Sequence, residues 1–147
     1  MKVTIVYDSR TGTTRSAALA MGSLFEEHGH SASVRPVAEA DPREVAASVL
    51  ICVGSWTQGL FVVLQHATKA TIAFIDRLTD IGGKPAVVFC TYKLATGSML
   101  PRMAAAFEAK GARVIGQFRF RGPTPDVGFR ALVSGLAPES TAPVESR

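Results

Sequence analysis

Hydroxyl side chains surround a single glycine near the N-terminus of the 147-residue sequence, where the chain reads Ser9, Arg10, Thr11, Gly12, Thr13 and Thr14. The cluster follows an apolar run and precedes a segment with helical periodicity, so it is expected at a helix N-terminus. Free backbone N–H groups and the helix dipole favour an anion there, and glycine lets the backbone approach it closely. The segment predicts a phosphate site; a serine- and threonine-rich helix cap is the structural alternative.

Two other phosphate-binding patterns are missing from this loop. It has no lysine, so it is not a Walker loop for nucleoside triphosphates. The dinucleotide pattern G-x-G-x-x-G is also absent, which weakens an NAD interpretation.

The only tryptophan of the chain lies in a second polar segment, which reads Ser55, Trp56, Thr57, Gln58 and Gly59. An indole ring that stacks on a planar ligand adds about 0.5–1.5 kcal/mol beyond simple burial. A tryptophan of the core or of a surface patch is the alternative. A third segment contains Thr91, Tyr92 and Gly97 and offers a second aromatic ring together with backbone amides, although Tyr92 is equally explained as the end of a strand.

Five strand-like runs and the helical stripes between them must position these segments. The runs cover residues 2–7, 33–36, 49–54, 85–90 and 113–120, and all but the second are rich in Val, Ile or Phe. Strict alternation of strands with helices predicts an α/β, doubly wound, five-stranded parallel sheet. Ligands of such sheets bind beyond the carboxyl ends of the strands, where the three polar segments are expected.

Helix signals complete this pattern. Apolar residues recur at three- and four-residue steps before Gly29 and before Gly111, which suit helix C-termini. Asp41 is expected to cap a helix that starts at Pro42. A further stripe formed by Ile72, Ile75 and Leu78 is expected to end at Gly82 and Gly83, and a short last stripe ends at residue 136. Residues 1–136 are predicted to form one domain, and residues 137–147 a flexible C-terminal tail.

The first segment, Ser9-x-Thr11-Gly12-x-Thr14, resembles the S/T-x-T-G-x-T phosphate loop of the flavodoxin family. This resemblance implies a flavodoxin-like fold with strand order 2-1-3-4-5 and FMN as the cofactor, held by the three segments. It covers about residues 1–136 and favours the short-chain form, because residues 116–122 run without an insertion. The match is looser in the second segment, where Trp56 follows Ser55 directly, and in the third, which lacks the usual Gly-Asp.

Composition excludes several classes of protein. No apolar run approaches the roughly 20 residues of a membrane span, and no basic block of the nucleic-acid-binding kind accompanies the net charge of +4. Cys52 and Cys90 lie in apolar runs without CxxC spacing, and three scattered histidines lack zinc-site spacing. The sequence therefore predicts a cytoplasmic protein without a membrane span, nucleic-acid partner or metal site, and the resemblance to flavodoxins implies that no catalytic side chain is required.

The resemblance implies a one-electron carrier between redox partner proteins, as a monomer or homodimer. An FMN-dependent reductase of a quinone or similar acceptor, and a flavodoxin-fold binding module that has lost flavin, remain as alternatives. One departure from acidic flavodoxins is the absence of Asp and Glu between Val53 and Ile75 and between Ile81 and Phe107. Because carboxylates near a reduced, anionic flavin would repel it, full reduction is expected to be easier here.

Overall fold

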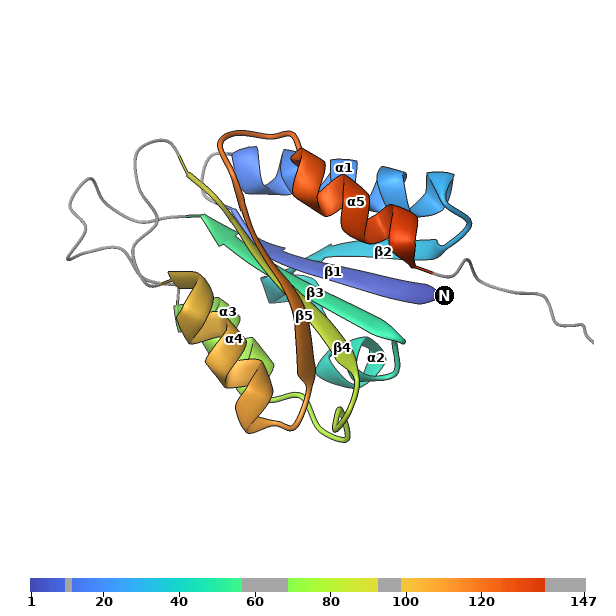
Figure 1. Ribbon diagram of the computed structural model, residues 1–147. Helices are drawn as coiled ribbons and strands as arrows, with labels where there is room; N and C mark the ends of the chain where they lie inside the picture. The colour runs from blue at the N-terminus through green and yellow to red at the C-terminus, as the bar shows by residue number, and fades with distance from the viewer. Residues whose placement is uncertain (10–11, 57–68, 93–98, 137–147) are drawn as a thin grey trace, which may run out of the picture.

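A computed structural model describes residues 1–9, 12–56, 69–92 and 99–136. Its centre is a five-stranded parallel sheet with strand order β2-β1-β3-β4-β5, which confirms the predicted order (Figure 1). The strands are β1 (Lys2–Asp8), β2 (Ser31–Pro36), β3 (Leu50–Trp56), β4 (Pro85–Thr91) and β5 (Arg113–Phe120).

The three inner strands are apolar because helices cover both faces of the sheet. Five consecutive residues of β1 and six of β3 and of β4 are buried. The outer strands β2 and β5 are only partly buried. Each sequence-based strand is confirmed, but β3 continues through Ser55 and Trp56, which pair with Cys90 and Thr91 of β4. The second polar segment thus begins inside a strand.

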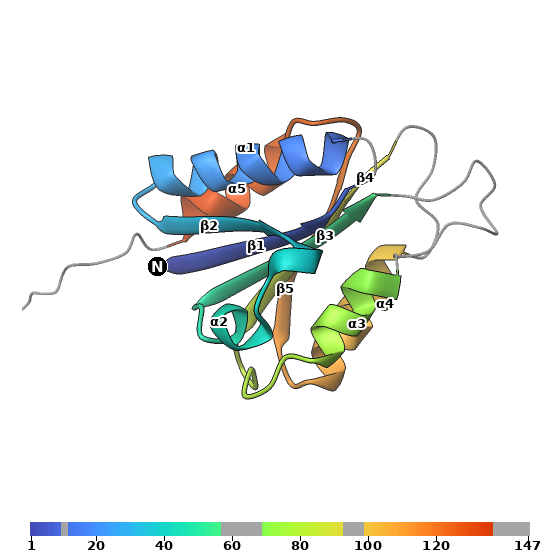
Figure 2. The same ribbon diagram turned by 180° about the vertical axis from the view of Figure 1, so that it is seen from behind.

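The helices form one layer on each face (Figures 1 and 2). Helices α1 (Thr13–Glu27) and α5 (Val127–Gly135) cover one face, while α2 (Pro42–Ala46), α3 (Lys69–Asp76) and α4 (Met99–Ala109) cover the other. A short 3₁₀ helix, η1 (Val37–Glu39), follows β2. Two apolar cores result, one between each layer and the sheet. In the part of the chain that the structure describes, no helix combines the length and apolar character of a membrane span.

Most helix ends fall where the sequence predicts. Gly29 and Gly111 have φ angles of 89° and 83°, as expected after helices α1 and α4. The carboxylate of Asp41 accepts a hydrogen bond from the N–H of Arg43 at 2.9 Å and caps α2. The stripe expected to extend through Leu78 is interrupted, because α3 ends at Asp76 and the N–H of Leu78 donates back to Ile75. Leu78 is still fully buried, in a turn that packs on the core.

Parallel strands bring their carboxyl ends to one edge of the sheet. In the register of the strands, Asp8 of β1 lies opposite Ser55 of β3, and Trp56 of β3 lies opposite Thr91 of β4. This edge lies at the end of the molecule away from the N-terminus (Figure 1). The sheet therefore gathers the starts of the three polar segments in one place.

Candidate functional site

The structure describes eight of the fourteen residues that the sequence nominates for a cofactor. They are Ser9, Gly12, Thr13, Thr14, Ser55, Trp56, Thr91 and Tyr92. The other six lie outside the described residues: Arg10, Thr11, Thr57, Gln58, Gly59 and Gly97.

Gly12 occupies the N-cap position of α1 in a left-handed conformation, with φ 94° and ψ −10°. A Cβ placed on it would have no neighbour within 4 Å, so the space above this glycine is open. The hydroxyl oxygen of Ser9 accepts hydrogen bonds from the N–H groups of Gly12 at 3.1 Å and Arg15 at 3.3 Å. Ser9 thus performs part of the capping role that was the alternative interpretation. An open left-handed glycine at the start of a 15-residue helix also fits a phosphate group.

Two threonines from separate segments form a buried link behind this glycine. The hydroxyl groups of Thr14 in α1 and Thr91 in β4 are 2.7 Å apart, and both residues are buried. This hydrogen bond joins the first polar segment to the third across 77 positions of sequence. It fixes the start of α1 relative to the carboxyl end of β4. The sequence nominated both residues but contained no signal that pairs them.

The second segment enters the site as the last two residues of β3. Ser55 is fully buried, and its hydroxyl donates to the carbonyl of Trp56 at 3.1 Å. Trp56 itself is half-buried, which separates it from a fully enclosed core tryptophan. Trp56 is the last residue of β3 and lies opposite Thr91, at the carboxyl edge of the sheet. The side chain is therefore placed where it can contact a ligand at this edge.

Tyr92 follows β4 and is half-buried. Its N–H donates to the carbonyl of Phe120 at 3.0 Å, so the end of β5 holds the start of the third segment in place. Sequence reasoning missed this role of Phe120, because a main-chain hydrogen bond between strand ends leaves no mark on residue type.

Metal chemistry and thiol chemistry find no support in the described residues. Within residues 1–9, 12–56, 69–92 and 99–136, no group of three or more His, Cys, Asp and Glu side chains could hold a metal ion. Cys52 and Cys90 are free, buried thiols. Burial raises the pKa of the Cys90 thiol to about 12, although the nearby Arg119 guanidinium partly opposes this shift. The thiol is therefore protonated at neutral pH and is not a nucleophile.

We expect the link between Thr14 and Thr91 to contribute to stability as a coupled pair. Thr14→Val and Thr91→Val should each lower the free energy of unfolding by about 1–2 kcal/mol, because each removes a buried hydrogen bond. The double variant should lose about 1 kcal/mol less than the sum of the two. Urea unfolding of the four proteins measures this coupling energy.

A pair elsewhere in the sheet provides the control. Thr4 and Ser48 share a buried hydroxyl contact of 2.5 Å near the other end of β1. Combining Thr14→Val with Ser48→Ala joins residues that do not contact each other, so these losses should add. Additive losses for Thr14 and Thr91 as well would show that their hydrogen bond does not couple the two segments.

Comparisons with known proteins agree with this architecture. The family model described as flavodoxin matches residues 5–135. A flavodoxin from Megasphaera elsdenii, solved in its two-electron reduced form, superposes with a TM-score of 0.76 at 23% identity, covering 90% of this chain and 96% of its own. A short-chain flavodoxin associated with a bacterial microcompartment gives 0.73 at 16% identity, with 91% and 92% covered. Comparison with curated proteins finds no match.

Proposed function

Since the chain belongs to the flavodoxin family, we propose that it binds FMN at the carboxyl edge of its sheet and carries electrons between redox proteins. FMN is the cofactor of this family. The observation that carries the proposal is the open, left-handed Gly12 at the N-terminus of α1, together with the half-buried Trp56 at the end of the neighbouring strand β3. These features supply an anion site and an aromatic surface at one edge of the sheet.

The three polar segments are proposed to bind different parts of FMN. Residues 9–14 are proposed to hold the phosphate group, through backbone N–H groups, the hydroxyls of Ser9, Thr11 and Thr13, and the side chain of Arg10. Thr14 is proposed to support this segment through its buried hydrogen bond to Thr91. Trp56 and Tyr92 are proposed to contact the flavin ring. The remaining proposed contacts come from Thr57, Gln58, Gly59 and Gly97, while the buried Ser55 and Thr91 are proposed to hold the strand ends in place.

FMN supplies reversible electron transfer when bound, so the protein needs no side chain that reacts with a substrate. Its residues bind the cofactor, orient it and keep water from one side of it. Ser55 supports this role because its buried hydroxyl is committed to the backbone of Trp56 and holds the end of β3 in shape. A quinone reductase would require a substrate pocket in addition to the FMN site. A binding module that has lost flavin would not use the proposed FMN site at all.

The test is a titration of the purified chain with FMN, followed by visible absorption and by fluorescence of the only tryptophan. We expect bound flavin to quench Trp56 strongly. Gly12→Ala should weaken FMN binding about 10-fold, because the added methyl group blocks close approach of the backbone to the phosphate. Strain of alanine at this φ angle should in addition lower stability by about 1–2 kcal/mol.

Gly83→Ala is the matched control. Gly83 also has a positive φ angle, 79°, and a Cβ there would also meet nothing within 4 Å, but it lies before β4 at the opposite edge of the sheet. Both variants should lose similar stability, and only Gly12→Ala should lose affinity for FMN.

A wild-type chain that neither binds FMN nor changes its fluorescence would show that the chain is not an FMN electron carrier. Turnover of quinones with a nicotinamide donor would favour the reductase. Cytoplasmic location and a monomeric or homodimeric state remain predictions.

A further inference from the structure

Positive charge is concentrated in the second half of the sequence. Residues 81–136 contain eight Lys and Arg residues but only two carboxylates, Glu108 and Asp126. Residues 1–80 contain seven Lys and Arg residues and eight carboxylates. The excess of cations thus belongs to the part of the chain that builds β4, α4, β5 and α5. Because β5 is the outer strand of the sheet, this excess lies on one side of the molecule.

Four of these cations lie toward the carboxyl edge of the sheet. Arg102 is the fourth residue of α4, Arg119 and Arg121 lie at the end of β5, and Arg130 is the fourth residue of α5. All four are exposed. We call Arg102, Arg119, Arg121 and Arg130 the basic patch, in which α4 with Arg102 and α5 with Arg130 lie on either side of the end of β5. The only described carboxylate among them, Asp126, accepts a hydrogen bond from the N–H of Phe129 at 3.0 Å and caps α5, so the helix N-terminus partly offsets its charge.

An apolar side chain accompanies the basic patch. Val127 begins α5 and is 80% exposed, the highest value among the three exposed large hydrophobic residues of the described chain. It precedes Arg130 by three positions and therefore shares a face of the helix with it. In the isolated protein this valine is surrounded by water. Burying its side chain against a partner would contribute favourable free energy to binding.

The basic patch adjoins the proposed FMN site. The carbonyl of Phe120, between Arg119 and Arg121, accepts the hydrogen bond from the N–H of Tyr92. Arg119 also lies opposite Cys90, next to Thr91 of the site. A partner that covers the basic patch would consequently come close to the cofactor.

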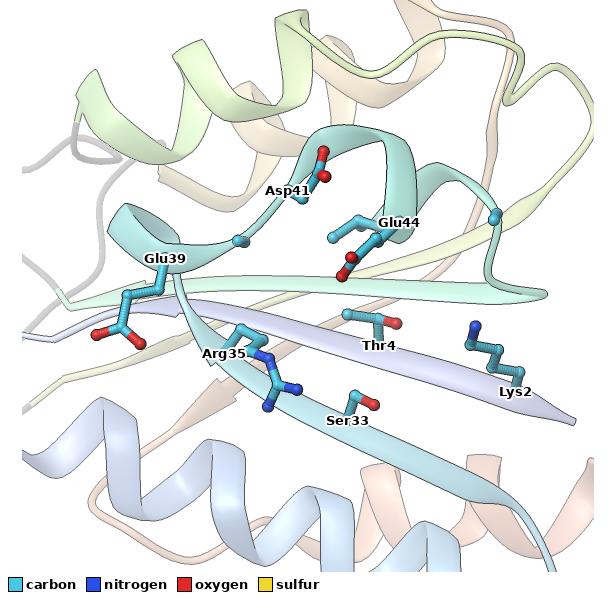
Figure 3. Close-up of a pocket in the computed structure, with 10 residues that line it drawn as sticks. Lys2, Thr4, Ser33, Arg35, Glu39, Asp41 and Glu44 are labelled. Atoms are coloured by element: carbon cyan, nitrogen blue, oxygen red, sulfur yellow. The ribbon is translucent and has the colours of Figure 1, made fainter.

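The opposite edge of the sheet, formed by β2, carries charges of both signs. A hollow of about 210 Å³ between β1, β2 and the segment around α2 is lined by cations and carboxylates together, which are Lys2, Arg35, Glu39, Asp41 and Glu44 (Figure 3). Neighbouring charges of opposite sign produce little net field at a distance. The charged side of the molecule that can steer a partner is therefore the β5 side.

We propose that the basic patch, with Val127, docks a redox protein whose cofactor is surrounded by carboxylates. This inference rests on the proposed function and adds the chemistry of the partner to it. Complementary charges accelerate encounter and orient the complex, while the apolar contact holds it. A nucleic acid is the less suitable partner, because its phosphate backbone binds rows of cations and makes no use of the exposed Val127.

The experiment uses the FMN-loaded chain, reduced with dithionite and mixed in a stopped-flow instrument with acidic cytochrome b5 or basic cytochrome c. Each ferric haem accepts one electron from the reduced protein and becomes ferrous. We expect the rate with cytochrome b5 to fall as salt is added and the rate with cytochrome c to rise. At low salt, R119E/R121E should slow the reduction of cytochrome b5 about 10-fold or more.

K110E/R113E is the matched control, because it makes the same change in net charge at the other end of β5 and α4. It should alter the rate less than about 3-fold. NMR titration of the oxidised, FMN-loaded chain with cytochrome b5 gives a second readout, in which the shifted amides should include Val127 and Arg130. Val127→Glu should weaken this binding, and Val127→Ile should preserve it.

The outcomes separate the two proposals. If neither cytochrome is reduced, the carrier function is wrong and the docking inference falls with it. If both are reduced but the two charge-reversal variants behave alike, the carrier function stands and the docking inference is overturned. Tighter binding of a short DNA duplex than of cytochrome b5, at about 0.15 M salt and through the same arginines, would overturn the choice of a protein partner.

Discussion

Gly54→Ala is expected to lower the free energy of unfolding by about 3 kcal/mol and the melting temperature by about 10 °C. Gly54 lies in the buried strand β3, directly opposite Phe89 of β4. A Cβ on Gly54 would lie less than 3.0 Å from three atoms of the Phe89 ring, closer than real Cβ atoms approach. The ring has little freedom to move, because it is fully buried and packs near Phe120 with ring centroids 6.0 Å apart.

Two comparisons make this prediction specific. Gly82→Ala should change stability by less than about 1 kcal/mol, because a Cβ there would meet nothing within 4 Å. Adding Phe89→Leu to Gly54→Ala should recover part of the loss, since the smaller side chain relieves the overlap. Thermal and urea unfolding of the full chain measure all of these effects. Equal stability of the Gly54 and Gly82 variants would show that the core around Phe89 adapts to the added methyl group.

Alkaline pH is expected to destabilise the protein by about 3 kcal/mol between about pH 8 and pH 10 through its two buried thiols. Burial raises the pKa of Cys52 far above its ordinary value, and it raises the pKa of Cys90 to about 12 against the opposing effect of Arg119. An unfolded chain ionises both thiols near their ordinary pKa of about 8.5–9. Above that pH the folded state binds more protons than the unfolded state, so stability falls as pH rises, by about 1.4 kcal/mol per thiol and pH unit.

The slope of stability against pH is the quantity to measure. Urea unfolding under reducing conditions at several pH values should show this decline in the wild-type chain. C52A/C90A should start from lower stability because it leaves small cavities, but its decline above about pH 9 should be shallower. Thiol reagents should modify neither cysteine in the native protein and both after unfolding. Identical slopes in the two proteins would mean that the thiols are not responsible.

Local features of the sequence were sufficient to predict most of the secondary structure. Apolar runs indicated the strands, because a strand that is covered by helices on both faces buries nearly all of its side chains. Gly29 and Gly111 marked helix ends, because their left-handed conformation is cheap only for glycine. Asp41 marked a helix start through a hydrogen bond two residues away. The family resemblance of residues 9–14 then supplied the strand order, which the structure confirms.

Contacts between distant parts of the chain could not be predicted in this way. Nothing in the sequence distinguishes Gly54, which cannot accept a Cβ, from Gly82, which can. The link between Thr14 and Thr91, the continuation of β3 through Trp56 and the position of the basic patch beside Tyr92 also depend on the register of the strands. The sequence by itself determined which segments form strands and helices and where most of them begin or end, because these preferences act over a few residues. Only the tertiary structure decided which side chains meet, because packing of the sheet and its helices brings together residues that are far apart along the chain.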